Sequence, residues 1–122
     1  MLLGCISSAL SAELAKVSGT LTYPKGSVLP PNAVVYINLM DVSPLEDNSG
    51  DIIARKTVTN PSQVPIPFEM EYNPARISSN HTYAILVQIA ANHEVLFRNT
   101  SAYPVITKGN PSAVEVLVNP VK

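Results

Sequence analysis

The sequence predicts an all-β domain: a single antiparallel β-sandwich, immunoglobulin-like, of seven to eight strands with a short N-terminal tether. Three observations support this fold class. Segments rich in Val, Ile, Thr and Tyr alternate between apolar and polar residues, which is the period of a half-buried strand. Turn-forming stretches separate these segments at the spacing typical of sandwiches. The 122 residues include 11 Pro but only 5 Gly, which fits short strands joined by rigid turns.

The first half of the predicted domain holds three strands. The alternation begins in KVSGTLTY, at residue 17, and a proline-rich loop follows it. Residues 33–42 are apolar at nearly every position, which favours a strand in the middle of a sheet. A turn-rich connection leads to a third strand at residues 51–59. We therefore assign residues 1–16 to a remnant of a signal sequence or lipobox with a tether, and residues 17–122 to the β-sandwich domain.

The prolines of the fourth predicted strand, residues 63–72, indicate where this strand lies in the sheet. Apolar and polar residues alternate along it, and Pro65 and Pro67 both fall on the polar face. Proline has no N–H to donate to a neighbouring strand. This strand is therefore expected at a sheet edge.

The remaining predicted strands follow a crossing at residues 73–81. Residues 82–91 are the most strand-like segment, and Asn92-His93 predicts a tight hairpin turn into residues 94–102. Residues 103–112 read as a stiff loop or short strand, and residues 113–121 close the domain. Tyr83, at the start of its strand, is expected to bond its hydroxyl to nearby backbone as in a tyrosine corner. The predicted core consists of Val35, Ile37, Leu39, Phe68, Ile85, Val87, Ile89, Phe97, Val116 and their neighbours.

Composition excludes several classes of function. Charged residues make up only 14% of the chain, with 8 Lys and Arg against 9 Asp and Glu. Such a balance argues against a nucleic-acid binder, which needs a basic face, and against a polybasic membrane patch. No apolar run reaches the roughly 18 residues that span a bilayer.

The sequence contains no catalytic motif and no metal-binding pattern. His81 and His93 stand alone, without the additional ligands that a zinc site needs, and read as turn or surface histidines. The stretch DVSPLEDNSGD hints at a calcium loop but lacks the required ligand spacing, so a solvated loop is expected; its acidic residues are Asp41, Glu46, Asp47 and Asp51. Asn80 and Asn99 match the glycosylation sequon by chance. We expect no enzyme activity, no cofactor and no metal.

The single cysteine, Cys5, bears on where the protein resides. Leu2-Leu3-Gly4-Cys5 resembles the lipobox of bacterial lipoproteins, in which the cysteine is lipidated and becomes the new N-terminus. Only four residues precede Cys5, fewer than the apolar region of a signal peptide requires. Two alternatives remain: an ordinary secretion signal cleaved near ALSA, and a cytosolic protein with an incidental cysteine. If the lipobox interpretation holds, Ile6 after the cysteine favours outer-membrane sorting by resemblance to such lipoproteins.

A family resemblance covers about residues 17–118. The segments VSGTLTYP, LPPNAVVYINLMDVS, VPIPFEMEYNPARISSNHTYAI and PVITKGNP occur in this order. They resemble the YbaY/YscW family of envelope lipoproteins, with LPPNA and NPARI…NHTY carrying most of the specificity. The resemblance implies a small lipid-anchored β-sandwich on the inner leaflet of the outer membrane, facing the periplasm. Some members are pilotins, which bind the C-terminal segment of a type III secretion secretin.

Two functions follow from these observations. The first is a non-enzymatic binding or chaperone module, such as a pilotin, that receives a protein client at an open sheet edge. The alternative is a structural or stress-linked outer-membrane lipoprotein without a secretion client. The preferred client edge is the first strand, with the last strand, residues 113–118, as a second candidate. A rival arrangement covers the first strand and leaves the client a groove or loop. The residues of the preferred edge are Val17, Ser18, Gly19, Thr20, Leu21 and Thr22.

Overall fold

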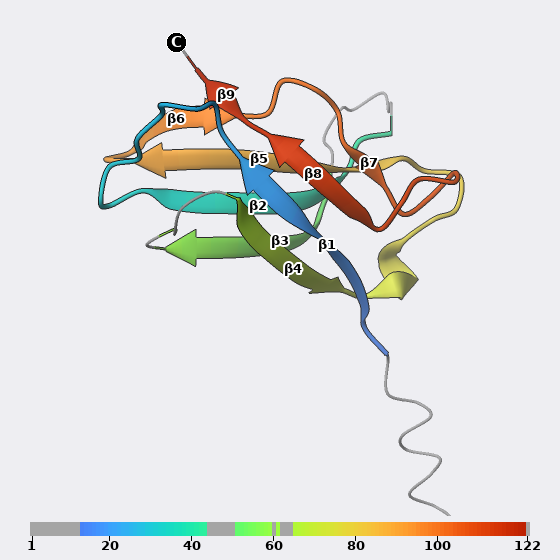
Figure 1. Ribbon diagram of the computed structural model, residues 1–122. Helices are drawn as coiled ribbons and strands as arrows, with labels where there is room; N and C mark the ends of the chain where they lie inside the picture. The colour runs from blue at the N-terminus through green and yellow to red at the C-terminus, as the bar shows by residue number, and fades with distance from the viewer. Residues whose placement is uncertain (1–12, 44–50, 60, 62–64, 122) are drawn as a thin grey trace, which may run out of the picture.

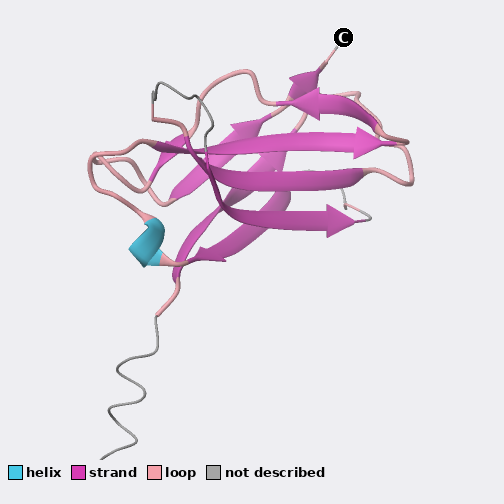
Figure 2. Cartoon of the chain, turned by 180° about the vertical axis from the view of Figure 1, so that it is seen from behind, coloured by secondary structure: helices cyan, strands magenta, loops and turns pink. Residues whose placement is uncertain are grey.

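The computed structural model describes residues 13–43, 51–59, 61 and 65–121 as two packed β-sheets. A three-stranded sheet lies across a six-stranded sheet (Figure 1). From behind, the long strands of the six-stranded sheet lie in front (Figure 2). The all-β sandwich prediction is confirmed. The strands are β1 (Ala15–Thr22), β2 (Val34–Asp41), β3 (Asp51–Thr59), β4 (Ile66–Tyr72), β5 (Tyr83–Ala91), β6 (Glu94–Arg98), β7 (Pro104–Val105), β8 (Ala113–Leu117) and β9 (Asn119–Pro120), with one 3-10 turn, η1 (Pro74–Arg76).

The strand order is β4-β1-β8 in the small sheet and β3-β2-β5-β6-β9 in the large one, where β7 also pairs with β5. The described residues hold nine strands rather than seven or eight, because β7 and β9 are two-residue strands. One pair departs from the expected antiparallel arrangement: β8 runs parallel to β1. The chain passes through β7 in the large sheet before it returns to the small sheet as β8.

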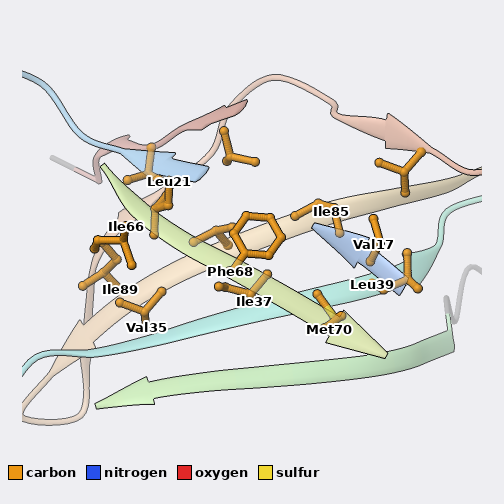
Figure 3. Close-up of a cluster of buried hydrophobic side chains, with 14 of the residues drawn as sticks. Val17, Leu21, Val35, Ile37, Leu39, Ile66, Phe68, Met70, Ile85 and Ile89 are labelled. Carbon is orange, nitrogen blue, oxygen red and sulfur yellow. The ribbon is translucent and has the colours of Figure 1, made fainter. Parts of the chain in front are cut away.

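The core lies between the two sheets and is built from alternating residues of both (Figure 3). Ile37, Ile85 and Val87 are completely buried, and every residue of the predicted core is buried. In β4, Ile66, Phe68 and Met70 point inward and the residues between them are exposed, as predicted, and Tyr72 continues the buried row. Burial of these apolar side chains is the main stabilising contribution to a disulfide-free domain of this size.

Gly19 sits opposite Phe68 in the core-facing row of the small sheet. A Cβ on Gly19 would lie 2.0 Å from the carbonyl oxygen of Val114 and 2.9 Å from the Phe68 ring. The absent side chain therefore lets the ring of Phe68 lie over β1 and lets β8 approach closely. This is the usual reason for a glycine inside a strand.

Two local predictions from the sequence are confirmed. Asn92 and His93 both adopt positive φ, 54° and 66°, as the two central residues of a type I′ hairpin turn require. The Tyr83 hydroxyl accepts a hydrogen bond of 2.8 Å from the backbone N–H of Ser78, five residues earlier. This bond ties the crossing that contains η1 to the start of β5.

Asn99 has a structural role that sequence reasoning missed. Its side-chain oxygen accepts a bond of 2.7 Å from the Val87 N–H, and its amide donates to the carbonyls of Ile85 and Ser101. These bonds serve β5 where pairing with β6 has ended and pairing with β7 has not begun. The Asn99 side chain thus bonds the backbone groups of β5 that have no neighbouring strand at this point.

Candidate partner-binding site

The sequence predicted that the first strand is an open edge, and this prediction is wrong. Residues 15–21 pair antiparallel with β4, and residues 18–22 pair parallel with β8. β1 therefore occupies the centre of its sheet, with its N–H and C=O groups divided between two neighbours. Residues 17–22 cannot accept a further strand without losing one they already have. The alternative in which the first strand is covered is the one that the structure adopts.

β8 is the terminal strand of this sheet, as the second candidate edge requires. The Ser18 N–H donates to the Ser112 carbonyl, and the Val118 N–H donates to the Thr22 carbonyl. Backbone groups alternate in direction along a strand. Val114 and Val116 therefore direct their backbone groups toward β1, and the outward set consists of Ala113, Glu115 and Leu117. We call this outward set the β8 edge.

The β8 edge is partly capped by a side chain. The Leu117 N–H points away from β1 and donates to the Tyr103 hydroxyl at 2.9 Å. In the part of the chain that the structure describes, no strand pairs with the outer side of β8. The backbone groups of Ala113 and Glu115 are therefore available to an incoming segment. Tyr103 marks where that segment would have to end or bend.

The surface beside this edge is shallow and built from small side chains. A hollow of about 400 Å³ lies over β1 and β8 on the outer face of the small sheet, lined by Ser18, Gly19, Thr20, Ala113, Val114 and Glu115. Leu117 adds an apolar contact at the end of the edge, with 43% of its surface exposed. A guest strand at β8 could place a side chain near this hollow.

Other outer edges are blunted by their sequence. In β4, the residues that bond β1 are the inward-facing ones, so Pro67 turns its missing donor outward between exposed acidic residues. The edge position predicted from Pro65 and Pro67 is therefore confirmed. On β3, the Arg76 guanidinium of η1 donates to the carbonyls of Ile52 and Ile53 at 3.4 and 3.3 Å. These features blunt β4 and the start of β3, which favours β8 for pairing.

His81 has a partner in the structure, although the sequence predicted an isolated histidine. Its Nδ1 lies 2.7 Å from Oδ2 of Asp41, a residue at the end of β2 that is largely buried. Burial alone would raise the pKa of Asp41, but hydrogen bonds from the Ser43 N–H and from His81 outweigh it and lower the pKa. The pair joins the end of β2 to the turn before β5. Among the described residues, no third acidic, histidine or cysteine side chain joins the pair in a group that could hold a metal ion.

The remaining predicted site residues divide into two groups. Cys5, Glu46 and Asp47 lie outside the described residues, so the lipidation site stays a prediction. Asp51 is exposed at the start of β3, and His93 is exposed in its hairpin turn. Within the described ranges, no helix is long and apolar enough to cross a bilayer.

The family model for type III secretion system lipoprotein chaperones (YscW) matches residues 12–118. The chain belongs to this family. The matched region runs from just before β1 to the end of β8 and so covers both sheets. The description of the family is that of lipoprotein chaperones of the type III secretion system.

Two relatives refine this assignment. The chain is 34% identical over 103 residues to the uncharacterized lipoprotein YbaY of Escherichia coli (strain K12), covering 84% of this chain and 54% of YbaY. It therefore spans about half the length of that relative. Its structure resembles an alternative pilotin from the type II secretion system of Vibrio cholerae, with a TM-score of 0.83 and 29% identity over 90% of this chain and 99% of the pilotin. The YbaY/YscW resemblance read from the sequence is confirmed.

Proposed function

We propose that this YscW-family domain is a lipid-anchored chaperone that captures an extended segment of a protein client as an added strand on the β8 edge. The observation that carries the proposal is a terminal strand with unpaired backbone groups at Ala113 and Glu115 in a family of secretion chaperones. Strand addition obtains affinity from main-chain hydrogen bonds and specificity from alternate side chains. It requires no reactive group.

The client that we propose is the C-terminal segment of an outer-membrane secretin. The family model names type III secretion, whereas the similar solved structure is a pilotin of type II secretion. A secretin is the class of client that fits both the type III and the type II secretion system. The charge around the edge adds a preference: Glu115, Glu69 and Glu71 are exposed on the same face. A guest strand with Lys or Arg directly opposite Glu115 would gain a favourable cross-strand pair.

The anchor that we propose is lipid on Cys5. β1 begins at Ala15, so about ten residues separate the cysteine from the sheet and reach at most roughly 35 Å when extended. This tether would hold the sandwich near the periplasmic side of the outer membrane, where a secretin is assembled. Such a placement favours an extended client that is still unfolded.

In bacterial cells that export the protein, Cys5 is expected to incorporate a fatty-acid analogue, and the protein is expected to fractionate with the outer membrane. Cys5→Ser should abolish labelling, because the thiol is the group that accepts the diacylglyceryl unit. The measurement is metabolic labelling followed by membrane fractionation. Equal labelling of the two proteins would contradict the lipid anchor on Cys5. It would leave the proposal of client capture at the β8 edge unaffected.

Glu115→Pro is the variant that tests client capture. It removes an outward N–H while leaving the bonds from Val114 and Val116 to β1 in place, and it blocks close approach of a second backbone. Binding of purified C-terminal segments from the secretins of the source genome, measured by titration calorimetry, should weaken about tenfold or more, the equivalent of roughly 1.4 kcal/mol.

The matched control is Glu115→Ala, which removes the charge but keeps the N–H. Its affinity should stay within about threefold of wild type, since an exposed charge contributes little. Both variants must keep the wild-type circular dichroism spectrum. Undiminished binding by a folded Glu115→Pro protein would contradict the β8 edge. Failure of every secretin segment to bind wild type would favour the alternative, a structural or stress-linked outer-membrane lipoprotein without a secretion client.

A further inference from the structure

The two outer faces of the sandwich carry opposite charges. The small sheet exposes Glu69, Glu71 and Glu115, with Lys16 as its cation, 3.8 Å from Glu69. The outer face of the large sheet carries Arg55 and Arg98. No acidic residue occurs among the described residues whose register places them on that outer face. A net charge of −1 conceals this separation.

Strand register fixes how the large outer face is laid out. Across one row, Arg55 of β3 lies opposite Asn38 of β2, which lies opposite Leu86 of β5. In the next row, Tyr36 of β2 lies opposite Gln88 of β5, which lies opposite Arg98 of β6. Met40 continues the β2 column. We call this set the arginine face: Tyr36, Asn38, Met40, Arg55, Leu86, Gln88 and Arg98.

Arg55 is held in position across the arginine face. Its Nε donates to Oδ1 of Asn38 at 2.6 Å, and its guanidinium lies over the Tyr36 ring at 5.7 Å from the centroid. Asn38 is only 8% exposed although it points outward. In the described part of the chain, the Arg55 Nη1 and Nη2 groups have no hydrogen-bond acceptor. A guanidinium binds a carboxylate in a bidentate geometry through two of its N–H groups.

The centre of the arginine face is apolar and hollowed. Tyr36, Met40 and Leu86 are each partly exposed. A hollow of about 450 Å³ follows Asn38, Met40, Leu86, Gln88 and Arg98, and a second of about 340 Å³ lies at the Tyr36 end, beside Val34 and Ala90. The long strands that form this surface are those in front in Figure 2. Apolar surface bordered by polar groups is typical of an interaction site.

The spacing of the two arginines indicates the shape of the partner. β3 and β6 are separated by β2 and β5, so the two columns lie three strand spacings, about 14 Å, apart. An α-helix with its side chains is about 10–12 Å wide. A helix lying over Met40 and Leu86 would therefore fit between the backbones of β3 and β6. Arg98 would lie on one side of it, and the Arg55 guanidinium, which reaches over β2, on the other.

We propose that the arginine face is a second docking surface, which binds an amphipathic helix of a protein partner with acidic residues on both sides of its apolar stripe. The apolar stripe would cover Met40 and Leu86, and the carboxylates would pair with Arg98 and with the Arg55 guanidinium that lies over the Tyr36 ring. This surface lies on the opposite side of the sandwich from the hollow beside the β8 edge, so it is independent of strand capture. Two cations are fewer than the four to eight of a polybasic lipid-binding cluster, which favours a protein partner over an anionic membrane.

The test uses two designed 18-residue peptides that share one apolar leucine stripe. One carries Glu at the flanking positions and the other carries Lys at the same positions. Fluorescence anisotropy with the full chain should give measurable binding for the Glu peptide and at least about tenfold weaker binding for the Lys peptide. Arg55→Gln and Arg98→Gln should each weaken the Glu peptide about three- to tenfold. Lys16→Gln, on the opposite face, should leave binding unchanged.

Amide chemical-shift changes locate the bound Glu peptide. The proposal requires them in β2 and β5, with Asn38 and Leu86 among the strongest. Equal affinity for both peptides, no binding of the Glu peptide at millimolar concentration, or changes confined to β1 and β8 would overturn it. Arginine-dependent binding to vesicles with phosphatidylglycerol, without peptide binding, would assign the surface to lipid and would also overturn it.

Discussion

Gly19→Ala is expected to destabilise the domain by about 3–5 kcal/mol, through overpacking and lost β1–β8 hydrogen bonds. The new Cβ would lie 2.0 Å from the Val114 carbonyl oxygen, a backbone atom that cannot move without breaking the pairing of β8 with β1. The Phe68 ring, 2.9 Å away, closes the other direction. Equilibrium unfolding in urea measures the change.

Ser18→Ala is the matched control, because Ser18 neighbours Gly19 but points away from the core. Its stability should stay within about 0.5 kcal/mol of wild type. The same variants probe the β8 edge, since a displaced β8 would take the edge with it. A Gly19→Ala protein as stable as wild type would mean that β8 does not lie as close to β1 as the structure has it.

Ile85→Ala should cost about 2–5 kcal/mol, the sum of lost burial and a residual cavity. Ile85 is completely buried in the middle of β5, a strand paired with β2 on one side and with β6 and β7 on the other. Such a site is enclosed by fixed strands and has little freedom to collapse. For a domain of this size, each kcal/mol lowers Tm by about 4 °C, which calorimetry measures directly.

Gln88→Ala, on the same strand but exposed on the opposite face, is the control. It should shift stability by less than about 0.5 kcal/mol. A cost for Ile85→Ala as small as that of Gln88→Ala would contradict the placement of β5 at the centre of the core. The contrast depends only on which face of one strand is buried.

Sequence alternation predicted which side chains face the core. The period of two is a local property, so it assigned Ile66, Phe68 and Met70 to the inside of β4 and found the core of β2 and β5. The same local chemistry predicted the Asn92-His93 turn and the hydroxyl bond of Tyr83. Each of these features involves residues close together in the chain.

Strand neighbours could not be predicted in the same way. Alternation gives the face of a side chain but not which strands flank it, so β1 was placed at an edge although it lies between β4 and β8. One signal was present: Gly19 interrupts an otherwise good strand, which often marks a close approach of another backbone. The sequence contained no comparable sign that β8 would return parallel to β1.

Long-range polar pairs were also beyond local reasoning. Asp41 and His81 are 40 residues apart and meet only because β2 and β5 are adjacent. Arg55 and Asn38 meet across β2 and β3, 17 residues apart. Of the candidate site, the sequence predicted the last strand as one possible edge. The Tyr103 cap and the arginine face required the fold.

Amide hydrogen exchange at Glu115 tests strand capture most directly. In the free protein the Glu115 N–H points outward from β8, so it should exchange rapidly, whereas the Val116 N–H, directed at β1, should be protected. Addition of a bound secretin segment is expected to slow exchange at Glu115 and to leave Val116 unchanged. If the segment binds while the Glu115 N–H still exchanges as in the free protein, the client does not pair with the β8 edge and the account is wrong.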